Sequence, residues 1–141
     1  MTRCDAAVLR GAVILVDVGA GQRFGLLVVT NVGTGDCTLN GFSDLQLVGQ
    51  NGEELPTRTQ QDLDPGPSTV TLPVGGVAAA NMRWSVVPGE GDAVEGPCQP
   101  TPSALRVSPP EETEQFEVPW TFGPVCQGGL IQLSAYFAPP V

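Results

Sequence analysis

Residues 77–87 read VAAANMRWSVV, and this stretch decides the fold. Because successive side chains of a β-strand point to opposite faces, a strand with one buried face shows apolar side chains at every second position. The stretch follows that pattern, and it therefore predicts a strand that covers a hydrophobic core. The side chains expected to face inward are Ala78, Ala80, Met82, Trp84 and Val86, and those expected to face outward are Ala79, Asn81, Arg83 and Ser85.

Other short apolar runs lie on both sides of this strand, and Gly and Pro separate them. The 141 residues include 18 Gly and 14 Pro, a share typical of many strands joined by turns. No run shows sustained helical periodicity. The other segments expected to be strands are Ala6–Leu9, Ala12–Val18, Gln22–Asn31, Cys37–Leu39, Leu45–Val48, Glu54–Arg58, Val70–Leu72, Ala104–Val107, Gln115–Val118 and Leu130–Phe137.

Loops and turns separate these segments. Asn51-Gly52 is the strongest hairpin signal and joins Leu45–Val48 to Glu54–Arg58. Residues 60–68 and 88–102 are expected to be loops. The pattern predicts one all-β domain over residues 1–141, an antiparallel, immunoglobulin-like sandwich of two sheets with about eight strands. A closed barrel is the alternative.

Composition limits the partners of such a domain. Apolar residues make up 41% and charged residues 15%, which is typical of a globular protein. The net charge is −9, which disfavours nucleic-acid binding and adhesion to anionic lipid, because both need clustered basic residues. No segment is long enough to span a membrane, so we expect no membrane insertion of this domain. The acidity is otherwise explained by solubility.

The four cysteines suggest two disulfides. They are widely spaced, and no close pair of the kind found in zinc sites is present. Of the three pairings, Cys4–Cys37 and Cys98–Cys126 join nearest neighbours along the chain and are favoured. Two disulfides would place the domain outside the cytoplasm, whereas four buried free thiols would allow a cytosolic location. No signal peptide precedes Cys4, so we expect the export signal or anchor to be absent from this sequence.

The residue types disfavour catalysis. The chain has no histidine, the commonest general base, and no lysine for Schiff-base chemistry. The adjacent acidic residues Glu53–Glu54 and Glu111–Glu112 are expected to be solvated turn residues. The carboxylates of Asp62–Asp64 are too few for a calcium site. We therefore expect no catalytic residue, no cofactor and no metal.

Trp120 and Phe122 form the candidate contact surface. They lie in a segment bounded by Pro119 and Pro124, close to Cys126 in sequence. Exposed aromatic side chains at such a place would suit a partner. The alternative is that both pack beneath the Cys98–Cys126 bridge.

Several blocks of the sequence resemble a known family. They are Cys4, Thr30–Gly33, Cys37–Phe42, Met82–Ser85, Cys98, Leu105–Pro110, Val118–Trp120 and Val125–Leu130. In these blocks the chain resembles family 4232 of the domain-of-unknown-function series, which occurs in actinobacterial secreted, lipid-anchored and membrane-anchored proteins. Ser43 departs from the pattern, since the family has a proline shortly after the second cysteine block. The resemblance implies export and a sandwich-like domain, and it implies no catalytic residues.

These observations lead to one expected function and two alternatives. The expected function is a non-catalytic, extracytoplasmic binding or interaction module whose partner is a protein or another ligand of the cell envelope. A structural spacer or scaffold in the cell envelope is the second reading. A metal-dependent hydrolase is the third, and it would need a deep pocket that holds at least two carboxylates. The sequence does not indicate the oligomeric state.

Overall fold

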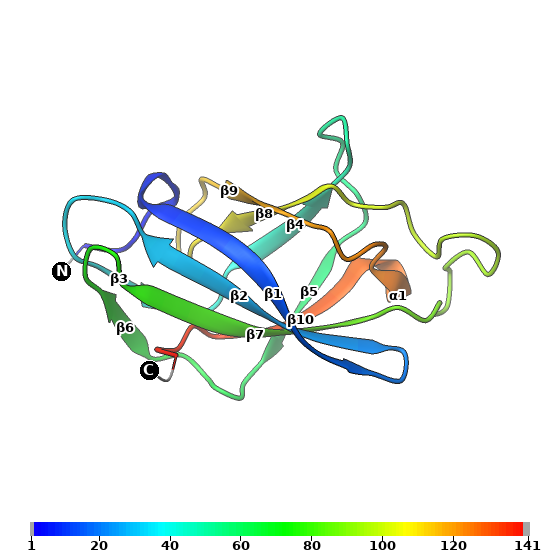
Figure 1. Ribbon diagram of the computed structural model, residues 1–141, viewed down its shortest axis with the longest axis horizontal. Helices are drawn as coiled ribbons and strands as arrows, with labels where there is room; N and C mark the ends of the chain where they lie inside the picture. Colours follow the sequence, from blue (N-terminus) through cyan, green and yellow to red (C-terminus); the bar gives the residue numbers. More distant parts are fainter. Residues whose placement is uncertain (1, 140–141) are drawn as a thin grey trace.

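The computed structural model describes residues 2–139, which form an all-β domain (Figure 1). A single 3₁₀ turn, η1 (Ala6–Val8), precedes the first strand, and α1 (Cys126–Gly129) is one turn that contains left-handed residues. The strands are β1 (Leu9–Gly19), β2 (Gln22–Asn31), β3 (Cys37–Asn40), β4 (Asp44–Val48), β5 (Arg58–Asp62), β6 (Thr69–Leu72), β7 (Val77–Ser85), β8 (Ala104–Ser108), β9 (Phe116–Pro119) and β10 (Leu130–Ser134).

The largest sheet has five strands in the order β1-β2-β7-β10-β5. Neighbouring strands are antiparallel except β5, which runs parallel to β10. Strand β7 therefore lies at the centre, with β2 on one side and β10 on the other. The strand that the alternating pattern of residues 77–87 predicts is thus confirmed.

The second layer is the antiparallel sheet β4-β8-β9, and β3 pairs with β6 in a separate antiparallel ribbon. One hydrophobic core joins them. It contains Leu27, Met82 and Leu133 from the large sheet and Leu105 and Val118 from the smaller one. The expected all-β sandwich of antiparallel sheets is confirmed.

Two disulfides link these layers to their connecting loops. Cys4 bonds to Cys37 and Cys98 to Cys126, and there is no free cysteine. The first attaches the N-terminal segment to β3. The second attaches the long loop after β7 to the turn α1, just before β10. Each bridge closes a loop of about 30 residues and stabilises the fold by about 3–4 kcal/mol in the chain-entropy model.

The N-terminal part differs from the expected pair of strands. The predicted strand Ala6–Leu9 is mostly the 3₁₀ turn η1, because the Asp5 side chain caps that turn by accepting a hydrogen bond from the Ala7 amide. Strand β1 then continues through Gly11 instead of breaking there. A side chain at Gly11 would meet Val118 of β9 at 2.8 Å, so the glycine permits close packing between the two layers.

The segment after the Asn51-Gly52 turn also differs. The turn forms, but of the predicted strand Glu54–Arg58 only Arg58 belongs to a strand, as the first residue of β5. Glu54 makes an isolated bridge to Val48, and the Leu55 amide donates to the Leu47 carbonyl. Strand β4 pairs instead with β8. Strand β5 occupies part of the segment expected to be a loop, and it is held by parallel pairing with β10.

Strand β7 shows the predicted alternation with two exceptions. The expected inward side chains from Ala78 to Trp84 are buried, while Asn81 and Arg83 are exposed. Ala79 is also buried, and Phe137 lies beside it, joined by two backbone hydrogen bonds of 2.9 and 2.8 Å. Ser85 is the second exception: its side chain is buried, and its hydroxyl donates a hydrogen bond to the Val87 carbonyl at 3.0 Å.

Candidate functional site

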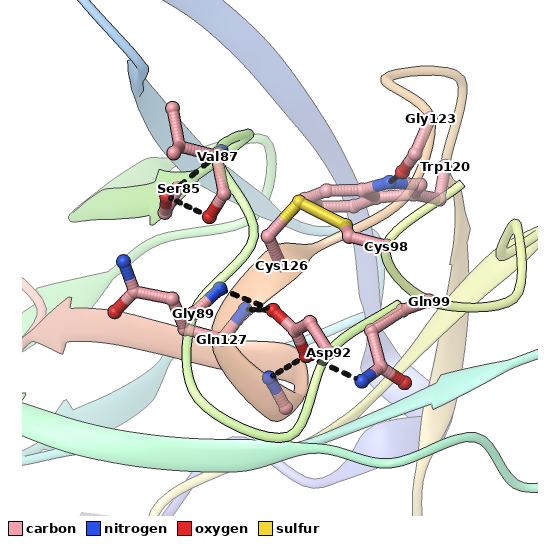
Figure 2. The surroundings of a disulfide bond; sticks show 11 residues. Ser85, Val87, Gly89, Asp92, Cys98, Gln99, Trp120, Gly123, Cys126 and Gln127 are labelled. Atoms are coloured by element: carbon pink, nitrogen blue, oxygen red, sulfur yellow. Dashed lines mark hydrogen bonds between the residues drawn. A yellow bond between two sulfur atoms is a disulfide. The ribbon is translucent and has the colours of Figure 1, made fainter. Parts of the chain in front are cut away.

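Of the two aromatic residues expected to form a contact surface, only Trp120 lies in the core. Trp120 is 3% exposed, and its indole N–H donates to the Gly123 carbonyl at 2.8 Å (Figure 2). Its ring lies 4.8 Å from that of Trp84 and 5.2 Å from that of Phe122, which is partly buried. Trp120 therefore offers no surface to a partner, so this half of the predicted contact surface is wrong, whereas Phe122 keeps part of its side chain exposed. Phe122 lines a small hollow with Cys98 and Cys126, as the packing alternative expects.

Asp92 is the most densely hydrogen-bonded side chain near the second disulfide (Figure 2). Its carboxylate accepts from the amides of Gly89 at 2.8 Å and Gly128 at 3.0 Å, from the amide of Gln127, and from the side chain of Gln99 at 2.7 Å. These bonds, that from Gly89 foremost, lower the pKa of Asp92 to about 2 against the opposing effect of burial. The carboxylate thus fastens the loop after β7 onto the turn α1.

The surroundings of Asp92 do not suit a ligand. A wide hollow of 720 Å³ lies there, lined in part by Arg58, Glu90 and Asp92. Asp92 is already bonded to four donors, and Arg58 donates to the Gln127 carbonyl at 2.9 Å. The Asp92 carboxylate also lies within 4.8 Å of the sulfurs of Cys98 and Cys126. Because those sulfurs are bonded to each other, they are not the thiolates that a metal would need.

The acidic pairs singled out from the sequence have structural partners. Arg3 forms ion pairs with Glu111 and Glu112, each at 3.0 Å, and so joins the N-terminal segment to the turn before β9. The Asp62 carboxylate accepts from the Asp64 amide at 3.1 Å, which closes a local turn. Neither group gathers carboxylates around a common point.

A further candidate surface is the outer face of the five-stranded sheet, which points away from the second layer. Directly paired residues of neighbouring strands point to the same side, so the registers identify the side chains that share this face. One row crosses all five strands, from β5 to β1: Gln60, Gln132, Arg83, Phe24 and Asp17. The neighbouring row continues through Asn81, Leu26 and Ile14. The outer face is therefore polar toward β5 and, apart from Asp17 at the end of the first row, apolar toward β1.

Two hollows occupy the outer face. The polar hollow has a volume of 520 Å³ and is lined chiefly by Gln60, Asp62, Asn81, Arg83 and Gln132. The apolar hollow has a volume of 380 Å³ and is lined chiefly by Val16, Leu26 and Phe137. Phe24, Asn81 and Met82 line both, so the two hollows are parts of one groove. Both volumes lie within the usual range of ligand sites, about 300–1,000 Å³.

The exposed apolar side chains of β1 extend this groove to the edge of the sheet. Ile14 is 50% exposed and Val16 is 60% exposed. Val16 is the extra residue at a bulge between Leu15 and Asp17, where the register of β1 against β2 shifts. Sequence reasoning missed the groove. The outward positions Asn81 and Arg83 were the only signal for it, and their neighbours come from strands whose order the sequence does not show.

Comparison with known proteins identifies the family. A sequence model for one protein family matches residues 4–136. The chain belongs to the domain of unknown function DUF4232. No curated protein and no solved structure matches it. The DUF4232 match spans both disulfides and every strand described above. No helix within residues 2–139 has the length and apolar character needed to cross a membrane.

Proposed function

We propose that this DUF4232 domain is a non-catalytic binding module that works outside the cytoplasm. The observation that carries the proposal is the groove on the outer face. The opposite face of the same sheet is closed by the second layer, whereas the outer face keeps exposed apolar side chains beside a row of polar ones. Contiguous apolar surface of this kind on a monomer typically marks an interaction site.

The two disulfides support the location. Disulfides persist in oxidising compartments and are rare in the cytosol. Both bridges join segments that are distant in sequence, with separations of 33 and 28 residues. We extend the proposal to an actinobacterial protein that is secreted or held at the envelope by a lipid or membrane anchor, as the family resemblance implies.

The chemistry of the chain supports a non-catalytic role. It has no histidine or lysine, and the most perturbed carboxylate, Asp92, has all its hydrogen bonds directed to the protein itself. A group that stays ionised down to about pH 2 is poorly suited to general acid catalysis near neutrality. Within the described residues, Asp62 is the single carboxylate that lines the groove.

A spacer or scaffold domain is the competing role, and an evenly polar surface would favour it. Photo-crosslinking in the native host separates the two roles. A photoreactive residue placed at Asn81, in the floor of the groove, is expected to give a discrete crosslinked species. The matched control places it at Val94, which is 87% exposed and lies outside the groove. Crosslinks of equal yield at both positions, or none at Asn81, would favour the spacer role.

A further inference from the structure

We propose that the groove binds a single amphiphilic molecule with an uncharged, hydroxyl-bearing head group and an aliphatic chain. The inference rests on the proposed function and names the ligand class of the same face. It follows from the division of the groove into a polar and an apolar hollow that meet at Phe24 and Asn81. A ligand that fills both hollows needs the same division within one molecule.

The polar hollow suits an uncharged head group. Its charged side chains within the described residues are Arg83 and Asp62, one of each sign, so they leave no net charge. Its other polar side chains include the carboxamides of Gln60, Gln132 and Asn81. A carboxamide both donates and accepts hydrogen bonds, as a hydroxyl group does. A row of carboxamides therefore matches several hydroxyl groups on one ligand.

Two of the carboxamides, those of Gln60 and Gln132, are also bonded to each other. The Gln132 side chain donates to the Gln60 side chain at 3.1 Å, which joins β10 to β5 across the floor of the groove. This bond uses one donor of Gln132 and one acceptor of Gln60. The carbonyl oxygen of Gln132 and the amide group of Gln60 bond to no other described side chain and can meet a ligand.

The apolar hollow suits an aliphatic chain. Leu26 and Phe137 form its walls together with Val16, and it continues to Ile14 at the exposed edge of the sheet. Burial of apolar surface drives such binding in rough proportion to the area removed from water. No charged side chain of the described residues lines this hollow, so an ionised group would find no partner there.

An extended peptide fits the groove less well. Peptides that add to a sheet do so by hydrogen bonds to an unpaired strand edge. The floor of the groove consists mainly of β2, β7 and β10, and each of these strands is paired on both sides. Recognition here must come from side chains, which favours a ligand with hydroxyl groups and an aliphatic chain.

Titration of the whole 141-residue domain with n-dodecyl-β-D-maltoside, kept below its critical micelle concentration, tests the proposal. The amide NMR spectrum of isotope-labelled protein reports the site. We expect saturable shifts at residues of both hollows, around Gln132 and around Leu26. Maltose, which is the head group alone, is expected to bind at least tenfold more weakly, because it leaves the apolar hollow empty.

Variants test whether binding of the maltoside depends on residues of the groove. Val16→Asn is expected to weaken binding of the maltoside about tenfold, and Gln132→Ala is expected to weaken it while the shifts around Leu26 persist. Val94→Asn changes a valine outside the groove that is more exposed, at 87% against 60% for Val16, and it is expected to leave the affinity unchanged. Equal effects of the two valine variants, or no shift in the groove, would overturn the proposal.

The crosslinking result distinguishes a failure of the proposed ligand class from a failure of the proposed binding function. A crosslink at Asn81 in a protein that ignores the maltoside would mean that the groove binds a ligand of another class. Failure of both experiments would remove the binding function as well.

Discussion

Two buried indoles in the aromatic cluster differ in how their N–H groups are satisfied. The Trp120 N–H donates to the Gly123 carbonyl, whereas the buried Trp84 N–H has no partner within the described residues. Trp→Phe removes a similar volume at both sites. We expect Trp120→Phe to lower the free energy of unfolding by about 1–2 kcal/mol more than Trp84→Phe, because it alone breaks a hydrogen bond. Urea unfolding measures both, and an equal or reversed order would contradict this description of the cluster.

The low pKa of Asp92 predicts how the free energy of unfolding depends on pH in acid. Its pKa is about 2 in the folded chain and near 3.8 when unperturbed, so the folded state favours the charged form. The stabilisation is complete above about pH 4 and is lost as the pH falls through about 2. We expect Asp92→Asn to cost about 2 kcal/mol at neutral pH and to remove this part of the acid dependence.

Glu90→Gln is the matched control for Asp92→Asn. Glu90 lies two residues away in the same loop and is exposed. Urea unfolding at several pH values should show little change for this variant. A cost as large as that of Asp92→Asn would mean that loop charge matters and that the hydrogen bonds of Asp92 do not.

At the scale of elements, the turn α1 depends on a close approach to the segment before β5. Gly129 has φ +81°, and a side chain there would lie 1.9 Å from the Pro56 carbonyl oxygen. Gly123 has a similar φ of +80° with nothing within 4 Å of that position. We expect Gly129→Ala to destabilise the fold by about 4 kcal/mol or to prevent folding, and Gly123→Ala to cost about 1–2 kcal/mol. Thermal unfolding compares them, and similar costs would rule out the close packing of α1.

Some elements could be predicted from the sequence and others could not. Strand β7 can be predicted because one of its faces is buried, which produces an alternation of apolar and polar side chains. Strand β5 is hard to predict because all five of its residues are polar, and its residues 60–62 fall in a segment expected to be a loop. What makes β5 a strand is its pairing with β10, about 70 residues later, and no local pattern shows such a contact. The fold class was thus predictable, while the edge of the main sheet was not.

The candidate site is harder to predict from the sequence than the strands are. Gln60, Arg83 and Phe24 belong to three strands, and only the strand order and register bring them into one row. Trp120 differs from its expected exposed position for a related reason. Its burial depends on Trp84, which lies on the central strand of the other layer.

At the scale of the whole molecule, the alkaline limit of stability should depend on one residue. Tyr136 is the only tyrosine, the chain has no lysine or histidine, and all cysteines are bridged. Burial raises the pKa of Tyr136, partly offset by its 2.7 Å hydrogen bond to Ser43. The folded state therefore favours the uncharged form of the Tyr136 side chain. The contribution of this preference to the free energy of unfolding is complete below about pH 10 and falls as the pH rises further.

We expect the free energy of unfolding to fall by about 1.4 kcal/mol for each pH unit above about pH 10. Tyr136→Phe should remove this slope, although it lowers stability at neutral pH by leaving the Ser43 hydroxyl without its partner. Urea unfolding between about pH 9 and pH 11 measures the slope. The same slope in the Phe variant would assign the alkaline transition to another group.

The most direct test of the account is the disulfide map of protein isolated from its own cells with thiols blocked at lysis. Mass spectrometry of non-reduced peptides should show Cys4 joined to Cys37 and Cys98 joined to Cys126 in essentially every molecule. That result would support both the fold and a place outside the cytoplasm. Free thiols at these positions, or a crossed pairing, would contradict the account of a disulfide-linked extracytoplasmic β-sandwich.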